Sequence, residues 1–177
     1  SAALRLASFV ALRCKHTLVC HRPSDLSPAI QPIIQTPAHG SLPSGHSGEA
    51  FASALVLSKV LEAAGRGDAA WRMDLMRLAS RIAINRTVAG VHYPVDSIAG
   101  CLLGATMGNY LVARARGLGS YTAWTFNGQA VAPHTDFDWR AVIDASAGTQ
   151  IASASYVIHD GVQDDVRLGS PLVAWLW

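Results

Sequence analysis

The chain has 177 residues, of which 50% are apolar and 15% are charged, and its formal net charge is +2. This length suits one domain with a sizeable hydrophobic core. The charge balance provides no polybasic face, so a nucleic acid is not an expected partner. The three cysteines are scattered and form no CxxC pair, which argues against a disulfide framework and against a cysteine zinc site.

The first predicted helix covers residues 1–22, and Pro23 is expected to end it. A proline-rich loop follows. Lys15 and Arg22 are seven residues apart, which would place both on one face of the helix. Two cations without nearby carboxylate partners suit a tetrahedral oxyanion, because arginine binds as a planar fork and lysine as a point charge. Taken alone, the pair is also typical of a solvated helix face.

The second cluster is Pro43-Ser44-Gly45-His46, directly before a helix predicted over residues 46–64. Gly45 permits close backbone approach, Ser44 offers a hydroxyl, and the free N–H groups of the helix point back at the loop. These features predict an anion site with a titratable imidazole, His46, at its edge. The alternative is an ordinary capped turn.

The third cluster lies between helices predicted over residues 68–87 and from Pro94 to about residue 116. Arg86 could add a second guanidinium. Asp96, in the first turn of the helix that Pro94 opens, can reach back to His92 just outside it. A carboxylate on one ring nitrogen fixes the tautomer and leaves the other nitrogen free and more basic, as a nucleophilic or ligating histidine requires. Alternatively, Asp96 merely complements the helix dipole.

The helix that begins at Pro94 carries no charged residue over positions 97–113. It also has Gly100, Gly104 and Gly108 at four-residue spacing, which occurs in closely packed transmembrane helices. Spanning segments need about 20 apolar residues, however, and the other predicted helices carry interior charges. We therefore expect a soluble protein in which this is a buried bundle helix whose glycines let a neighbour approach.

The chain divides into a helical catalytic core over residues 1–117 and an extension over residues 118–177, packed on the same domain. Weak periodicity predicts a loop-rich cap with a short hairpin, followed by a helix that Pro171 opens. Both ends look like interrupted helices. We therefore expect additional segments, or a second copy of the chain, to complete the bundle.

Taken together, the order K-x6-R-P, P-S-G-H and R-x5-H-x3-D resembles the signature of the type 2 phosphatidic acid phosphatase and vanadium-dependent haloperoxidase superfamily. The resemblance covers residues 15–96. The third motif usually begins Ser-Arg, whereas this chain has Asn85-Arg86. The resemblance implies an all-α helical bundle and favours a periplasmic or secreted location.

The resemblance also implies a pocket that holds phosphate or vanadate and needs no divalent metal. His92 would be the residue bonded to phosphorus or vanadium, Asp96 would orient it, and His46 would be the acid–base group. The residues implied in binding the oxyanion are Lys15, Arg22, Ser44, Gly45, His46, Arg86 and His92.

Two activities share such a pocket. In an acid phosphatase, His92 attacks a phosphomonoester, His46 protonates the leaving oxygen, and water releases the phosphohistidine. In a haloperoxidase, His92 anchors the vanadate at which hydrogen peroxide oxidises a halide. His39, in the loop before Ser44, matches a histidine of bromide-oxidising members and would be a proton relay. On this basis we favour the haloperoxidase branch, with bromide as the halide.

Two further interpretations involve no such catalysis. A binding module could capture phosphate in the same pocket without turning it over. The three imidazoles of His39, His46 and His92 could also hold a metal ion. The neighbouring cations Lys15 and Arg22 would repel that ion, so we do not favour the metal site.

Overall fold

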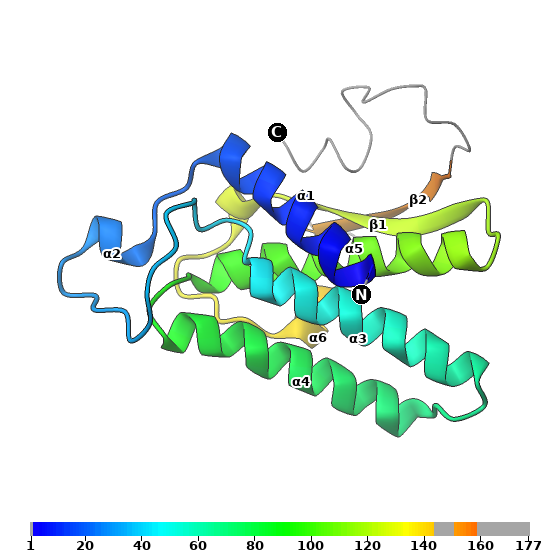
Figure 1. The fold of residues 1–177 in the computed structure, drawn as a ribbon. Helices are drawn as coiled ribbons and strands as arrows, with labels where there is room; N and C mark the ends of the chain where they lie inside the picture. The colour runs from blue at the N-terminus through cyan, green and yellow to red at the C-terminus, as the bar shows by residue number, and fades with distance from the viewer. Residues whose placement is uncertain (1, 144–150, 159–177) are drawn as a thin grey trace.

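The computed structural model describes residues 2–143 and 151–158. Four long helices dominate it, and two short helices, a 3-10 turn and two strands complete it (Figure 1). The elements are α1 (Ala2–Leu18), α2 (Pro23–Leu26), α3 (Gly45–Ala63), α4 (Ala69–Val88), α5 (Pro94–Ala115), β1 (Ser120–Phe126), η1 (Gly128–Ala130), α6 (Trp139–Ile143) and β2 (Ile151–Val157). The predicted helical bundle with a loop-rich C-terminal segment is confirmed.

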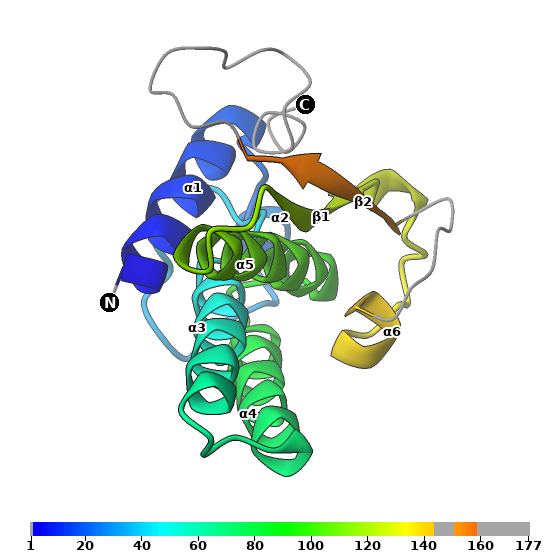
Figure 2. The same ribbon diagram turned by 90° about the vertical axis from the view of Figure 1, so that its right-hand side faces the viewer.

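Helix α5 is the central element. Helices α3 and α4 pack as a pair on one side of it, the two strands cover the other side, and α1 crosses α3 and α5 (Figures 1 and 2). Leu102 and Leu103 of α5 are fully buried, and so is Phe51 of α3. Within the described residues, no helix has the length and apolar character needed to cross a membrane.

The glycines of α5 let it touch α3 backbone to backbone. A Cβ atom added at Gly104 would overlap the carbonyl oxygen of Gly48, and one at Gly100 would lie 2.5 Å from the carbonyl oxygen of Ser44. The close-packing role predicted for these glycines is confirmed, and the neighbour is α3. Two hydrogen bonds secure the same crossing, because the Ser44 amide donates to the Asp96 carbonyl at 2.8 Å and the Ser47 hydroxyl to the Ser97 carbonyl at 2.9 Å.

Helix α1 ends at Leu18, earlier than the sequence predicts. Val19 takes a left-handed conformation, with φ of 47°, and its amide donates to the Lys15 carbonyl at 3.0 Å. Pro23 does not end this helix but opens α2, where proline is well suited to the first turn, and Arg22 is the N-cap residue. The prediction that Lys15 and Arg22 share one helix face is therefore wrong.

The strands β1 and β2 pair antiparallel, with Ser120 opposite Val157 and Phe126 opposite Ile151. They are separated by residues 127–150, so they do not form the predicted short hairpin. The pair lies on α5, where the Trp124 amide donates to the Thr106 hydroxyl at 3.4 Å. The helix predicted to begin at Pro171 lies outside the described residues.

The glycine contact between α5 and α3 gives the first prediction. Alanine normally stabilises a helix interior by about 1 kcal/mol relative to glycine. At Gly104 the added methyl group would instead force two backbones apart, so we expect Gly104→Ala to destabilise the protein by about 1–3 kcal/mol. Urea denaturation of both proteins measures this difference. Gly119→Ala is the matched control, because nothing lies within 4 Å of a Cβ there; equal effects of the two changes would contradict the packing role.

Candidate active site

One cavity of about 220 Å³ brings together most of the residues predicted for the site. They come from α1, from the segments on either side of α2, from the start of α3, from the end of α4 and from the loop before α5. The predicted residues that line it are Lys15, Arg22, His39, Gly45, His46, Arg86 and His92. Ser44 and Asp96 are buried and do not line the cavity.

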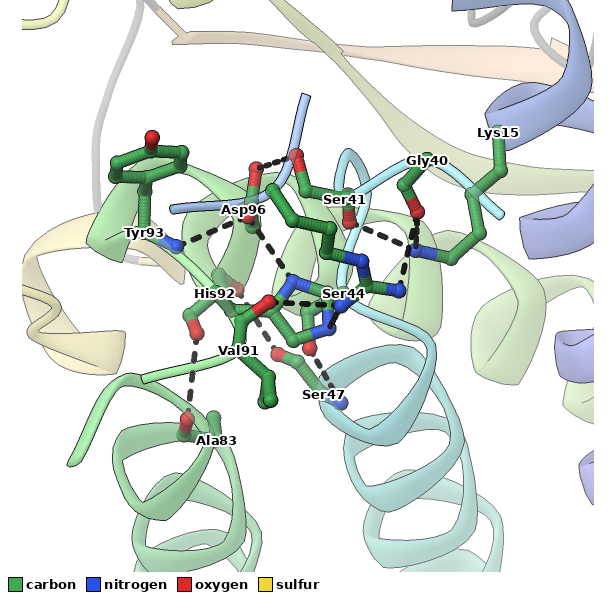
Figure 3. Close-up of polar contacts among 12 residues, drawn as sticks. Lys15, Gly40, Ser41, Ser44, Ser47, Ala83, Val91, His92, Tyr93 and Asp96 are labelled. Carbon is green, nitrogen blue, oxygen red and sulfur yellow. Dashed lines mark hydrogen bonds and ion pairs between the residues drawn. The ribbon is translucent and has the colours of Figure 1, made fainter. Parts of the chain in front are cut away.

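Lys15 is a buried cation in the wall of the cavity, with 2% of its surface exposed. Its Nζ atom donates to the carbonyl oxygens of Gly40 at 2.9 Å and Ser41 at 2.7 Å (Figure 3). An ammonium group has three donors, so one remains for a bound oxyanion. Burial lowers the pKa of Lys15 to about 8, and the nearby Arg22 contributes to the same shift.

Arg22 connects the loop before α3 with the loop before α5. Its guanidinium donates through Nη1 to the Val91 carbonyl at 2.7 Å, through Nε to the His39 carbonyl at 3.2 Å, and through Nη2 to the Gly40 carbonyl at 3.2 Å. Lys15 and Arg22 therefore share the Gly40 carbonyl. The two cations converge as predicted, although through backbone carbonyls rather than through a common helix face.

His92 and Asp96 form the predicted hydrogen bond. The Nδ1 atom of His92 lies 3.0 Å from Oδ2 of Asp96, and 4% and 2% of the two residues are exposed. The same carboxylate accepts hydrogen bonds from the Tyr93 amide at 3.0 Å and from the Ser41 hydroxyl at 3.5 Å (Figure 3). The carboxylate is therefore held in place by several donors. Because it accepts a hydrogen bond from Nδ1 of His92, it favours the tautomer with the proton on Nδ1.

The second ring nitrogen of His92 also has a partner. Nε2 lies 3.1 Å from Nη1 of Arg22, so in the tautomer with the proton on Nδ1 it accepts a hydrogen bond from the guanidinium. The expectation that this nitrogen is free is therefore wrong. Burial lowers the pKa of His92 to about 4, against the opposing effect of Asp96. The imidazole is thus neutral near pH 7, as a nucleophile must be.

The start of α3 forms one wall of the cavity. The Ser44 side chain caps this helix by accepting a hydrogen bond from the Ser47 amide at 3.4 Å. Gly45 and His46 occupy the first two positions of the helix, where N–H groups have no intrahelical acceptors and can bind an anion. His46 lines the cavity, and partial burial lowers its pKa while Arg86 lowers it further.

Arg86 adds a third cation from the last turn of α4. Its Nε atom is buried and has no hydrogen-bond partner among the residues that the structure describes. A buried donor without a partner is costly, and an oxyanion in the cavity would satisfy it. The residue before it, Asn85, is exposed and does not line the cavity, so the departure from the usual Ser-Arg motif lies outside the wall.

His39 lies beside Arg22 on the same cavity wall, with its Nδ1 atom 3.2 Å from Nη2 of Arg22. The sequence prediction missed two polar residues of this wall, Ser8 of α1 and Glu49 of α3. The position of Glu49 three residues after His46 could have indicated that both lie on one helix face. Ser8 has no comparable signal, because its contact depends on how α1 crosses α3.

The imidazoles of His39, His46 and His92 all line this cavity, but they form no metal site. Within residues 2–143 and 151–158, no group of three or more His, Cys, Asp or Glu side chains could hold a metal ion.

Comparison with known proteins places this site in a family. A family model described as the PAP2 superfamily matches residues 1–118, which include every predicted site residue. Two curated relatives are 33% identical over 104 residues, and both are named decaprenylphosphoryl-5-phosphoribose phosphatase, from two strains of Mycobacterium tuberculosis (CDC 1551 / Oshkosh and H37Rv). The alignment covers 58% of this chain and 52% of each relative, so the chain spans about half the length of the curated relatives it matches.

These names bear on the branch that the sequence prediction favoured. Both relatives are named as phosphatases, which supports the alternative prediction rather than the haloperoxidase branch. The family match itself extends over more than half of the chain and includes all three motifs. The chain therefore belongs to the PAP2 superfamily.

Proposed function

We propose that this protein is a phosphatase that hydrolyses phosphomonoesters through a phosphohistidine on His92. The observation that carries the proposal is the position of this imidazole. It is buried, its Nδ1 atom lies 3.0 Å from Oδ2 of Asp96, and it lines a cavity with three cations; burial also lowers its pKa to about 4. That arrangement prepares a nucleophile for an electrophile that carries negative oxygens.

In the proposed reaction, the phosphoryl oxygens bind to Lys15, Arg22 and Arg86 and to the first N–H groups of α3. Nε2 of His92 forms the P–N bond while the P–O bond to the leaving group breaks. His46 gives its proton to the leaving oxygen. Water then attacks phosphorus, His46 takes a proton from it, and the P–N electron pair returns to Nε2.

This sequence requires Arg22 to exchange one hydrogen bond. Its Nη1 atom lies 3.1 Å from Nε2 of His92, the atom that would attack. The donor would turn from the ring nitrogen to a phosphoryl oxygen as the substrate enters. Because Nη1 also donates to the Val91 carbonyl, the guanidinium remains anchored during this exchange.

A second cavity favours an apolar leaving group. This groove, of about 370 Å³, lies between α1, α3 and α4, and His46 and Glu49 line both cavities. Its other walls are mainly apolar and include Leu4, Ala50, Ala54, Leu57, Leu75, Leu78, Ala79 and Ile82. The curated relatives are named for a substrate that carries a decaprenyl chain. We therefore propose a phosphomonoester of an amphiphilic alcohol as the substrate.

One observation supports haloperoxidase activity as a second candidate function. His39 lines the cavity and contacts Arg22, where a second imidazole could transfer a proton. The unpartnered Nε of Arg86 and the remaining Nζ donor of Lys15 also suit vanadate, which would bond to His92. Vanadate would supply the activation of hydrogen peroxide for oxidising a halide. His39 would then serve that reaction.

A paired assay tests the two candidates. We expect release of phosphate from a chromogenic phosphomonoester, inhibited by orthovanadate, and loss of this activity by about 10³-fold or more in His92→Ala because the nucleophile is gone. The exposed His16 gives the control, and His16→Ala should retain activity. In parallel, vanadate-loaded protein receives bromide, hydrogen peroxide and a brominatable dye. Bromination lost in His92→Ala, without phosphate release, would overturn the phosphatase proposal.

The proposed acid–base roles predict an acidic pH optimum for kcat/KM. Attack requires neutral His92, so activity should rise with pH through about 4. His46 must carry a proton to act as the acid, and its pKa is lowered from 6.5. As the pH rises further, activity should therefore fall again, and this fall should begin before neutral pH is reached. In His46→Ala this fall should disappear. Activity should then fall only at about pH 8, where Lys15 loses its proton. The substrate ionises in the same way with both proteins, so the difference between the two pH profiles reports the ionisation of His46.

A comparison of leaving groups tests His46 separately. An alkyl phosphate needs protonation of its leaving oxygen much more than nitrophenyl phosphate does. We therefore expect His46→Ala to reduce kcat/KM for the alkyl ester by about 10²-fold or more and that for the nitrophenyl ester by considerably less. Equal losses for the two substrates would exclude His46 as the proton donor.

A further inference from the structure

Glu49 places a carboxylate in a cavity that is otherwise built for an anion. It lies on α3, three residues after His46, and is half-buried. It lines the cavity that contains Lys15, Arg22 and Arg86, and it also lines the apolar groove. A negative charge there repels a bound phosphoryl group and weakens substrate binding, so the carboxylate is expected to serve another purpose.

A hydrogen bond from α1 holds this carboxylate in place. The Ser8 hydroxyl donates to Oε1 of Glu49 across the contact between α1 and α3. Within the described part of the chain, Glu49 forms no ion pair with a lysine, arginine or histidine. Its negative charge is therefore fixed in position but not neutralised by direct contact, and it remains available to act on its surroundings.

His46 is the group on which this charge acts. Arg86 from α4, Lys15 from α1 and Arg22 from the segment before α2 all disfavour a positive imidazole, and partial burial does the same. Glu49, one turn along the same helix, is the charged group that favours it. The imidazoles of His39 and His92 face the same cavity. At the junction of the cavity and the groove, the proton on His46 thus depends on Glu49.

We propose that Glu49, held by Ser8, is a positioning residue that favours the protonated form of His46 for donation to the leaving oxygen. The inference rests on the proposed phosphatase function. Glu49 itself transfers no proton: the proton passes from His46 to the leaving oxygen as the P–O bond breaks, and His46 regains one from the attacking water. The cost of the arrangement is weaker binding of the phosphoryl group.

The decisive variant is Glu49→Gln, which removes the charge but keeps an oxygen that can accept the Ser8 hydrogen bond. Titration of the His46 imidazole by NMR, assigned with His46→Ala, should show a pKa lower by about half to one unit in the variant. This measurement needs no turnover. An unchanged His46 titration would overturn the inference, whatever reaction the protein catalyses.

Kinetics distinguish this role from a merely structural one. In Glu49→Gln, kcat/KM for an alkyl phosphate should fall by about threefold to tenfold near neutral pH, with little change for nitrophenyl phosphate. Orthovanadate should bind about twofold to fivefold more tightly, because a like charge is gone. Damage to the fold would reduce the hydrolysis of both esters and the binding of orthovanadate together, and that result would contradict the proposal.

Two control variants complete the experiment. Glu62→Gln removes an exposed charge from the same helix and should leave all three properties unchanged. Ser8→Ala retains the negative charge of Glu49, so it should reduce alkyl phosphate hydrolysis less than Glu49→Gln does. A wild-type protein that releases no phosphate from either ester would refute the proposed function, whereas the NMR titration decides the role of Glu49 separately.

Discussion

The close contact of α3 with α5 is the constraint on which the site depends. Because Gly100 and Gly104 have no side chains, the carbonyl oxygens at the start of α3 lie directly against α5. The Ser44 amide can then donate to the Asp96 carbonyl, which joins the first turns of the two helices. One first turn presents N–H groups to the cavity, and the other carries the carboxylate that holds His92. A wider separation would move the anion-binding turn away from the imidazole.

Burial of charge is the second organising feature. Lys15 and Arg22 are almost fully buried, and backbone carbonyls replace the water that each has lost. Neither forms an ion pair with a carboxylate in the described structure, and the same is true of Arg86. The three cations therefore repel one another across the cavity, and an anion that binds there relieves this repulsion in surroundings of low dielectric. The same burial lowers the pKa of His92, so the affinity of the cavity for an anion and the preference of this imidazole for its neutral form have one physical origin.

Features determined by local spacing could be predicted from the sequence. The glycines of α5 follow a helical spacing, and Asp96 in the first turn of α5 lies only four residues after the loop residue His92, so the sequence indicated both features correctly. The end of α1 could not be predicted, because a left-handed β-branched Val19 is rare and gives no signal of the kind that glycine gives. The carbonyl ligands of the cations were missed because every residue has a carbonyl group. The Ser8–Glu49 contact and the strand pairing across residues 127–150 depend on tertiary packing.

The choice between hydrolysis and halide oxidation turns on what lies beside the oxyanion cavity. The cations, His92 and Asp96 suit both reactions, because both place a tetrahedral or trigonal-bipyramidal oxyanion on the same imidazole. His39 contacts Arg22 and would support the arginine in either case. The apolar groove, which His46 and Glu49 also line, is different in kind. A leaving alcohol needs a place for its chain as well as a proton for its oxygen, whereas halide oxidation consumes a proton but needs no place for a chain. His46 lies where the groove meets the cavity, and this position favours cleavage of a P–O bond.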